Sequence, residues 1–284
     1  MVKKFKNEDI LKMKLDGFFL SASQVPYKNN HPIRIVQAVK SIIGININIE
    51  HKKLIDWLEN FLFKFDKKKI DSIKLNKIDI PDLVVLSTLD ELILSNDKKK
   101  SKEYLHHIIN AATPLYILEF FIEISLKNKN IESLLFCWSC YRSLLFLGKN
   151  FNPSSLLYLC LDSLFYDRVN KNNDKKLFNV NKFEIMCNLD EIKKSSFVRA
   201  KNILEYLNTD FYLNYIQLDK CINKNNIKLI NDNAGRYDLL DYINENEINE
   251  YIILLFDSLR SKFKHSNENV IPDFNNLLIN LQND

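Results

Sequence analysis

Glycine is scarce in this sequence, and its scarcity limits the folds and cofactor sites that the chain can form. The four glycines are Gly17, Gly44, Gly148 and Gly235, and none lies near another. A Rossmann fingerprint or a P-loop needs two or three glycines within about eight residues, so that the backbone can approach a phosphate. Neither motif is present. Open sheets also need glycine for tight turns, whereas helices use it mainly at their C-termini, so the sequence favours helices.

Apolar residues recur at helical spacing along most of the chain. The run 32–43 begins with proline, follows a cap at Asn30 or His31 and ends at Gly44, which is typical of a helix. The run 49–65 follows closely, and the short connection indicates an antiparallel helix pair. The same periodicity predicts further helices over 81–94, 104–126, 131–147, 153–164, 190–207, 209–224, 236–243, 246–264 and 272–281.

We therefore predict an all-α, single-domain bundle over 1–284, with roughly ten or more helices packed as antiparallel pairs and no substantial sheet. The polar, irregular stretch 168–182 predicts a surface loop. The runs 83–86 and 227–230 are also compatible with short strands. Because helices are paired along the whole chain, an α-solenoid is an alternative to the compact bundle.

Charge and hydropathy argue against two kinds of binding partner, nucleic acid and membranes. Lys and Arg number 40 against 36 Asp and Glu, and a net charge of +4 is too mild to predict nucleic-acid binding. The basic runs 67–69 and 98–100 predict solvated loops. No stretch approaches the roughly 18 uncharged apolar residues of a membrane span, and no apolar run follows the basic N-terminus. Five cysteines without secreted-scaffold spacing predict reduced thiols. We expect a cytoplasmic protein that binds neither nucleic acid nor a membrane.

The segment Tyr27-Lys28-Asn29-Asn30-His31-Pro32 lies directly before a predicted helix. One interpretation is a helix N-cap with an exposed histidine. The other is an imidazole fixed at a helix start, where the local positive potential favours its neutral, proton-accepting form. His51, at the start of the next helix, is expected to be an exposed residue of the cap region.

A second polar cluster precedes the long apolar helices. Glu103 and His106 have the Glu-x-x-His spacing of di-iron carboxylate bundles, but such a site needs a second copy, which the sequence lacks. The alternative interpretation is that Glu103 and His106 are polar residues near the start of a helix and bind no metal. Pro114 should kink or interrupt the helix and leave carbonyls near His107 and Asn110 unpaired, which is a common way to line a pocket.

The segment Cys137-Trp138-Ser139-Cys140 lies within an apolar helical run and follows no strand. Redox-active Cys-x-x-Cys pairs usually begin a helix after a strand, so this one predicts core packing. No Gly-x-Ser-x-Gly elbow is present, and Ser-His-Asp hydrolase chemistry therefore has no support.

Three short blocks are notable for their order along the chain. They are Asn29-Asn30-His31-Pro32 with the helix to Gly44, His107 to Pro114 with the helix from Cys137 to Leu147, and Asn267 to Pro272. Taken in this order, the blocks resemble the questin oxidase-like family, a group of mostly helical proteins of bacteria and fungi. In the third block Asn269 stands where the family tends to have a histidine, and Pro272 stands where it has a lysine.

This resemblance implies an oxidoreductase that inserts oxygen into a ring of an aromatic polyketide, in the manner of a Baeyer–Villiger reaction, with NADPH and without a metal. It implies that His31, His107 and Glu268 converge on one apolar cavity as catalytic groups. The substrate would be bound by Tyr27, Asn30, Asn110, Trp138, Tyr141 and Asn269.

Two other functions remain open. A non-catalytic helical scaffold or α-solenoid interaction protein predicts histidines scattered on the exterior and an apolar surface stripe. A helical metal-dependent oxygenase would use Glu103 and His106 as ligands.

Overall fold

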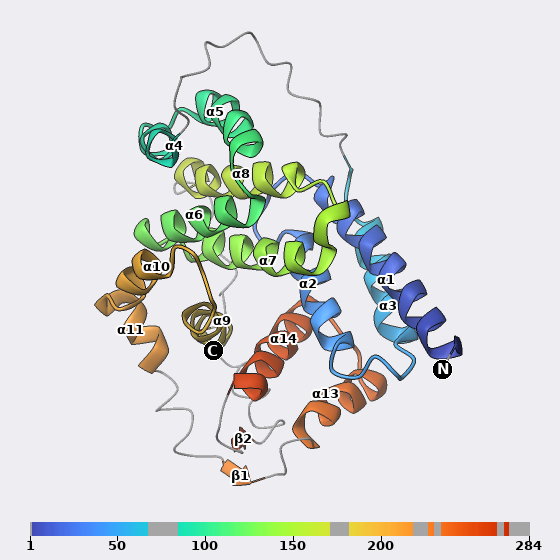
Figure 1. Ribbon diagram of the computed structural model, residues 1–284. Helices are drawn as coiled ribbons and strands as arrows, with labels where there is room; N and C mark the ends of the chain where they lie inside the picture. The colour runs from blue at the N-terminus through green and yellow to red at the C-terminus, as the bar shows by residue number, and fades with distance from the viewer. Residues whose placement is uncertain are drawn as a thin grey trace.

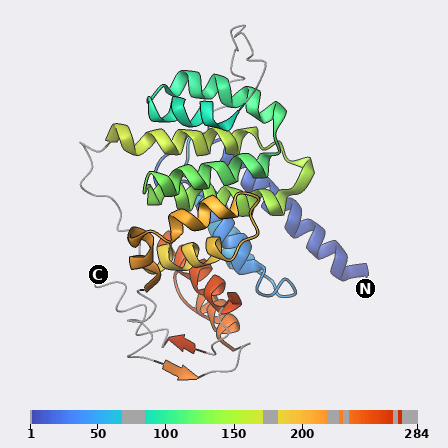
Figure 2. The same ribbon diagram turned by 60° about the vertical axis from the view of Figure 1, so that its left-hand side comes forward.

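The computed structural model describes residues 2–67, 85–170, 182–217, 227–229, 234–265 and 270–272. These segments form an all-α bundle, as the sequence predicts, with one two-stranded ribbon beside it (Figure 1). In both views α4 and α5 lie at one end of the molecule and the ribbon at the other (Figures 1 and 2).

Helices make up nearly all of the described secondary structure. In chain order, the α-helices are α1 (Val2–Ser23), α2 (Pro32–Ile43), α3 (Lys52–Phe63), α4 (Leu86–Leu94), α5 (Lys98–Ala111), α6 (Pro114–Lys127), α7 (Ile131–Leu147), α8 (Ser154–Asn170), α9 (Lys182–Lys193), α10 (Ala200–Leu207), α11 (Asp210–Gln217), α13 (Ala234–Glu245) and α14 (Glu250–His265). A 3-10 turn, η1 (Gly148–Asn150), follows α7. The strands are β1 (Ile227–Leu229) and β2 (Val270–Pro272).

Helix α7 is the central element of the bundle. It packs against α2, α6, α8 and α9, and nearly all of its side chains are buried, polar ones included. A helix that is apolar on all sides is typically surrounded by other helices, and the sequence of α7 has this character. Cys137 and Cys140 are both fully buried within it, which confirms the predicted core packing of the Cys-x-x-Cys segment.

Helix α14 packs against α2 and α9, so that α2, α7, α9 and α14 face one another around a shared interior (Figure 1). This group of helices comes from four distant parts of the sequence. It brings polar and charged side chains together at the candidate site described below.

The helix ends follow the predicted signals. Pro32 opens α2 behind its N-cap His31, and the Gly44 N–H donates to the Lys40 carbonyl at 3.1 Å to close it. Gly148 ends α7 with a φ of 70°, a left-handed conformation that glycine adopts without strain. Pro114 divides the predicted run 104–126 into α5 and α6, because its ring lacks the N–H that would continue the helix.

Four local predictions need correction. The run 190–207 is not one helix, because α9 ends at Lys193 and α10 begins at Ala200. Lys98–Lys100 form the first turn of α5 rather than a loop, and Asp97 caps that turn by accepting from the Lys100 N–H at 3.0 Å. Helix α8 extends to Asn170, so the predicted loop at 168–182 begins later, and 171–181 lie outside the described residues. His51 is buried rather than exposed, and its Nε2 donates to the Asn46 carbonyl at 2.7 Å.

The run 227–230, whose sequence is compatible with a short strand, contains β1. It pairs with β2 in antiparallel register, with Ile227 opposite Pro272 and Leu229 opposite Val270. The predicted final helix over 272–281 lies outside the described residues apart from its first position, which belongs to β2.

Candidate functional site

A cluster of buried charges lies where α2, α7, α9 and α14 meet. The Arg142 guanidinium donates to both carboxylate oxygens of Asp257, at 2.7 and 2.8 Å, and to the Ser41 hydroxyl at 2.8 Å. All three side chains are buried. A bidentate arginine–carboxylate pair of this kind combines charge with fixed orientation, and here it joins α7 to α14.

A second arginine and a second carboxylate complete the cluster. Arg260 donates from Nε to Asp257 at 3.1 Å, and its Nη2 lies 3.6 Å from Glu191. Glu191 also lies 3.6 Å from Arg142 and accepts from the Trp138 indole N–H at 3.2 Å. Two guanidinium charges are therefore balanced by two carboxylate charges.

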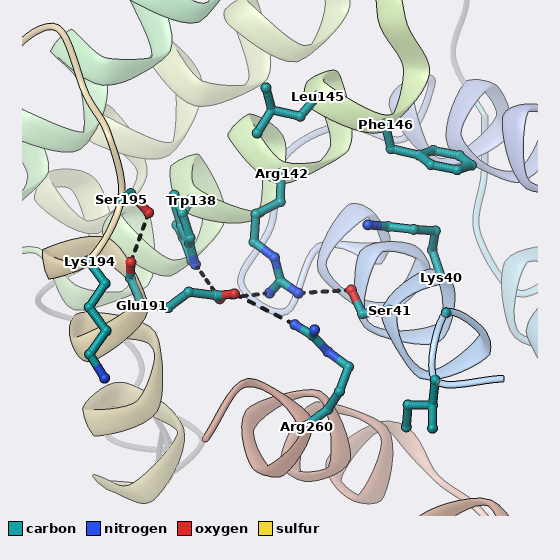
Figure 3. A pocket seen from close by; sticks show the side chains of 12 residues that line it. Lys40, Ser41, Trp138, Arg142, Leu145, Phe146, Glu191, Lys194, Ser195 and Arg260 are labelled. Atoms are coloured by element: carbon teal, nitrogen blue, oxygen red, sulfur yellow. Dashed lines mark hydrogen bonds and ion pairs between the residues drawn. The ribbon is translucent and has the colours of Figure 1, made fainter. Parts of the chain in front are cut away.

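Beside this cluster is a pocket of about 670 Å³ (Figure 3). Its volume lies within the range of small-molecule sites, about 300 to 1,000 Å³. The pocket is lined by Lys40, Ser41, Gly44, Ile45, Trp138, Arg142, Leu145, Phe146, Glu191, Lys194, Ser195 and Arg260.

Lys40 is the charged residue of the pocket that lacks a counter-ion. Among the described residues, no carboxylate lies within ion-pair distance of its ammonium, which instead lies over the Phe146 ring at 5.3 Å from the centroid. By contrast, Lys194 lies 2.6 Å from Asp190. Burial, and after it the nearby Arg142 charge, lowers the pKa of Lys40 to about 8.

One wall of the pocket is aromatic. The Trp138 ring stacks on Tyr141 at 5.6 Å between centroids, and Phe197 packs edge-on against both rings. Phe146 lies on the same helix as Trp138, two turns further along. The site therefore offers a planar apolar surface next to its charged groups.

His31 does not line this pocket, and both of its ring nitrogens form hydrogen bonds to the backbone. It is 1% exposed, its Nε2 donates to the Val25 carbonyl at 2.9 Å, and its Nδ1 accepts from the Ile33 N–H at 3.2 Å. Burial lowers its pKa to about 4, although the bond to Val25 opposes that shift. The ring is held between Tyr27 and Phe136. Both nitrogens are occupied, and the neutral form is fixed in one tautomer.

Asn30 lies next to His31 and takes part in a separate buried ion network. Its side-chain oxygen accepts from Arg34 at 3.3 Å, and Arg34 also binds Glu132 and Glu184. This network connects α2 to α7 and α9. It has no pocket residue in common with the site at Lys40.

His107 and Asn110 lie on α5, at the end of the molecule away from α14 (Figure 1). The Asn110 amide donates to the His106 carbonyl at 3.1 Å, and the buried Nε2 of His107 has no hydrogen-bond partner among the described residues. No ring contact, hydrogen bond or ion pair in the described ranges joins His107 to His31.

Helix α8 gives a scale for the separation of the two histidines. His106, the neighbour of His107, contacts the Tyr158 hydroxyl at 3.2 Å, whereas Tyr27, which stacks on His31, contacts Tyr166. Positions 158 and 166 are about 12 Å apart along a helix axis at 1.5 Å per residue, so the surroundings of His106 and of His31 lie about two helical turns apart on α8.

Of the predicted site residues, Trp138 lines the pocket and Tyr141 stacks behind it. Glu268 and Asn269 lie outside the described residues.

The described residues contain no group of three or more His, Cys, Asp or Glu side chains that could hold a metal ion. His106 is bonded to Tyr158, and no contact joins it to Glu103 in the part of the chain that the structure describes. Nor does this part contain a helix long and apolar enough to cross a membrane.

Sequence reasoning missed Lys40, Ser41, Arg142, Glu191 and Arg260. Arg142 carried a usable signal, because it is a charged residue within an otherwise apolar helix. Such a residue is almost never fully buried unless it is paired, so its presence predicts a buried counter-ion. Which carboxylate would pair with it depends on how distant helices pack.

Comparisons with protein-family models, with curated proteins and with solved structures gave no match for this chain. The resemblance to the questin oxidase-like family therefore stays a prediction.

Proposed function

We propose that the chain binds a small organic anion with an aromatic or branched apolar body, in the pocket among α2, α7, α9 and α14. The observation that carries this proposal is the Lys40 ammonium, which is half-buried beside the pocket and has no counter-ion among the residues that the structure describes. A buried charge normally has a partner, since leaving it unpaired costs free energy. A bound anion would supply that partner.

The charge balance indicates one negative group on the ligand. Asp257 and Glu191 balance Arg142 and Arg260, and Asp190 balances Lys194. Within the described ranges, the Lys40 charge is the one that no carboxylate of the pocket compensates. A carboxylate or another singly charged group would neutralise it.

The hydrogen-bond donors that have no partner in the described ranges indicate where the negative group of the ligand would lie. Arg142 directs both terminal nitrogens to Asp257 and Ser41. Arg260 keeps Nη1 without a partner in the described ranges. Figure 3 shows Lys40 extending from α2 and Arg260 extending from α14, both toward Arg142. An anion between Lys40 and Arg260 would receive charge-assisted hydrogen bonds from both.

The rest of the pocket suits an apolar body. Trp138, Ile45 and Phe146 contribute apolar surface to the pocket, and Lys40 lies over the Phe146 ring. Aromatic rings prefer offset-stacked or edge-to-face contacts, which Trp138 and Phe146 can provide to a planar ligand. We therefore name aromatic monocarboxylates as the simplest probes of the site.

The oxygen-insertion activity with NADPH, implied by the family resemblance, remains a separate prediction. Binding of an aromatic anion is compatible with such an oxidoreductase and with a non-catalytic binding protein. The positions of His31 and His107 do not themselves provide a catalytic pair for it, because His31 has both nitrogens bonded within the fold.

Isothermal titration calorimetry with phenylacetate tests the proposal, with benzyl alcohol as the uncharged probe of similar shape. We expect Lys40→Met to weaken phenylacetate binding about tenfold or more, since hydrogen bonds to charged groups contribute about 1.5 to 3 kcal/mol. Binding of benzyl alcohol should be weaker and insensitive to the substitution.

Lys12→Met is the matched control. Lys12 lies over the same Phe146 ring, at 4.7 Å, but it is paired with Asp16 and is largely exposed. Its removal should leave phenylacetate binding unchanged. Equal losses in the two variants, or no binding by the wild-type protein, would contradict the proposed function.

A further inference from the structure

We infer that Lys40 is a nucleophilic amine that forms an imine with the carbonyl group of a 2-oxo acid, whose carboxylate is held by Arg260. The inference rests on the proposed function and names the substrate class of the same pocket. It adds a covalent step that anion binding alone does not require.

The first support is the charged environment of Lys40. From α7 it faces Arg142, from α14 Arg260 and Asp257, from α9 Glu191, and from the segment after α9 Lys194. Both carboxylates in this group are bound by the arginines rather than by Lys40. Asp257 and Glu191 act to raise the pKa of Lys40, but burial and the Arg142 charge lower it by more.

An ordinary lysine is a poor nucleophile because it is protonated at neutral pH. Desolvation and a neighbouring cation are the two means by which proteins generate a neutral, reactive amine. Lys40 has both. With a pKa of about 8, about one Lys40 in ten is neutral at pH 7, on the order of 200 times the neutral fraction of an unperturbed lysine.

The second support is the hydroxyl of Ser41, the residue that follows Lys40. Its oxygen accepts from the Arg142 guanidinium at 2.8 Å and from the Gln37 amide at 3.0 Å. With both of these bonds directed to the oxygen, the hydroxyl proton is left to donate, and Ser41 lines the pocket. A hydroxyl that accepts two hydrogen bonds becomes a stronger donor. It would polarise a carbonyl oxygen placed beside Lys40.

The arrangement of donors matches a 2-oxo acid. Arg260, Lys40 and Ser41 line the same pocket. In this class of acid the carboxylate is bonded to the ketone carbon, so a carboxylate bound at Arg260 Nη1 would present its carbonyl group toward Lys40 and Ser41. The side chain of the acid would then lie against Phe146, the ring over which Lys40 lies. Bulky or aromatic 2-oxo acids fit the volume of the pocket better than small ones.

The step balances without an oxidant. The lone pair on Lys40 Nζ forms a bond to the carbonyl carbon, and the π electrons move to the oxygen, which accepts the Ser41 hydrogen bond. Water takes a proton from the nitrogen and returns one to the oxygen, which gives a carbinolamine. Loss of one water molecule from the carbinolamine leaves the imine.

Reductive trapping tests the inference. The full-length protein is treated with phenylpyruvate and cyanoborohydride at pH 7, and the modified lysines are located by peptide mass spectrometry. We expect Lys40 to be labelled at least tenfold faster than Lys12, at a rate similar to that of the free α-amino group, whose usual pKa is also about 8. Phenylacetone, which lacks the carboxylate, should label Lys40 at least tenfold more slowly than phenylpyruvate.

Three outcomes contradict the inference, and they differ in which part of the account remains. Binding of phenylacetate together with equal labelling of Lys40 and Lys12 removes the imine but retains the proposed function. Absence of both binding and selective labelling removes the proposed function as well. Selective labelling that persists equally with phenylacetone contradicts the role of Arg260.

Discussion

The Arg142 guanidinium on α7 donates to both carboxylate oxygens of Asp257 on α14, at 2.7 and 2.8 Å, in an interior that the sequence fills mainly with leucine, isoleucine and phenylalanine. Arg142 lines the candidate site, and Asp257 holds its guanidinium in place. The pair also makes the stability of this region depend on the balance of buried charges as well as on apolar packing.

Replacing Asp257 with Asn should destabilise the protein by about 3 to 5 kcal/mol, because it leaves two buried arginines with one carboxylate. Urea unfolding monitored by circular dichroism measures the change. Asp190→Asn is the control, since its pair with Lys194 is exposed and contributes about 0 to 1 kcal/mol. If the two variants lost equal stability, the interior pair would have no special role.

His31 should make stability depend on pH in a defined direction. Burial lowers its pKa from 6.5 to about 4 in the folded protein, so the unfolded chain binds a proton first as the pH falls. The contribution, about 3 kcal/mol, is present above pH 6.5 and is lost progressively down to about pH 4.

The variant His31→Asn retains a helix-capping side chain but does not titrate. Its free energy of unfolding should therefore fall less than that of the wild type between pH 7 and 4.5. His51, whose pKa is also lowered by burial, leaves a smaller slope in both proteins. Identical pH profiles would show that His31 is not held in its neutral form.

Lys40→Met should stabilise the protein in the absence of ligand. The folded pKa of about 8 lies below the usual 10.5, so at neutral pH the buried ammonium costs free energy, and this cost disappears only as the pH rises toward 10.5. We expect a gain of about 1 kcal/mol after allowing for partial exposure. Thermal and urea unfolding measure it. A loss of stability would mean that Lys40 supports the fold rather than a ligand.

Phenylacetate binding should weaken as Lys40 loses its proton. Between pH 6 and 7 the affinity should be nearly constant, and above about pH 8 it should fall several-fold by pH 9.5. Arg142 and Arg260 keep their charge over this range and do not contribute to the change. Calorimetric titrations at several pH values measure it, and the Lys40→Met variant should show a flat profile.

Much of the fold could be predicted because its signals are local. Pro32 and Gly148 delimit helices through the missing N–H of proline and the left-handed φ of glycine. The apolar periodicity over 131–147 predicted α7 itself, whereas its central position in the bundle depends on how the other helices pack around it. Helix α1 was missed because its buried residues Leu15 and Phe19 alternate with exposed apolar residues such as Met13, which blurs the periodicity.

The site could not be predicted because its residues interact across helices that are distant in sequence. Arg142 and Asp257 are 115 positions apart, and each looks like an ordinary charged residue until α7 and α14 pack together. His31, by contrast, drew attention through its position before a helix. His31 caps α2, as the first of the two interpretations has it, but the exposure expected of that cap is wrong. The neutral form belongs to the second interpretation, and burial is its main cause. The Nε2 atom donates to a carbonyl six residues earlier.

The most direct test of the proposed site is an NMR titration of the Lys40 ammonium with carbon-13 lysine labelling, assigned by the loss of its signal in Lys40→Met. We predict a pKa near 8 in the free protein and a rise when phenylacetate is present at saturation, because a bound anion stabilises the ammonium. A pKa near the ordinary lysine value that phenylacetate does not change would contradict the proposed site.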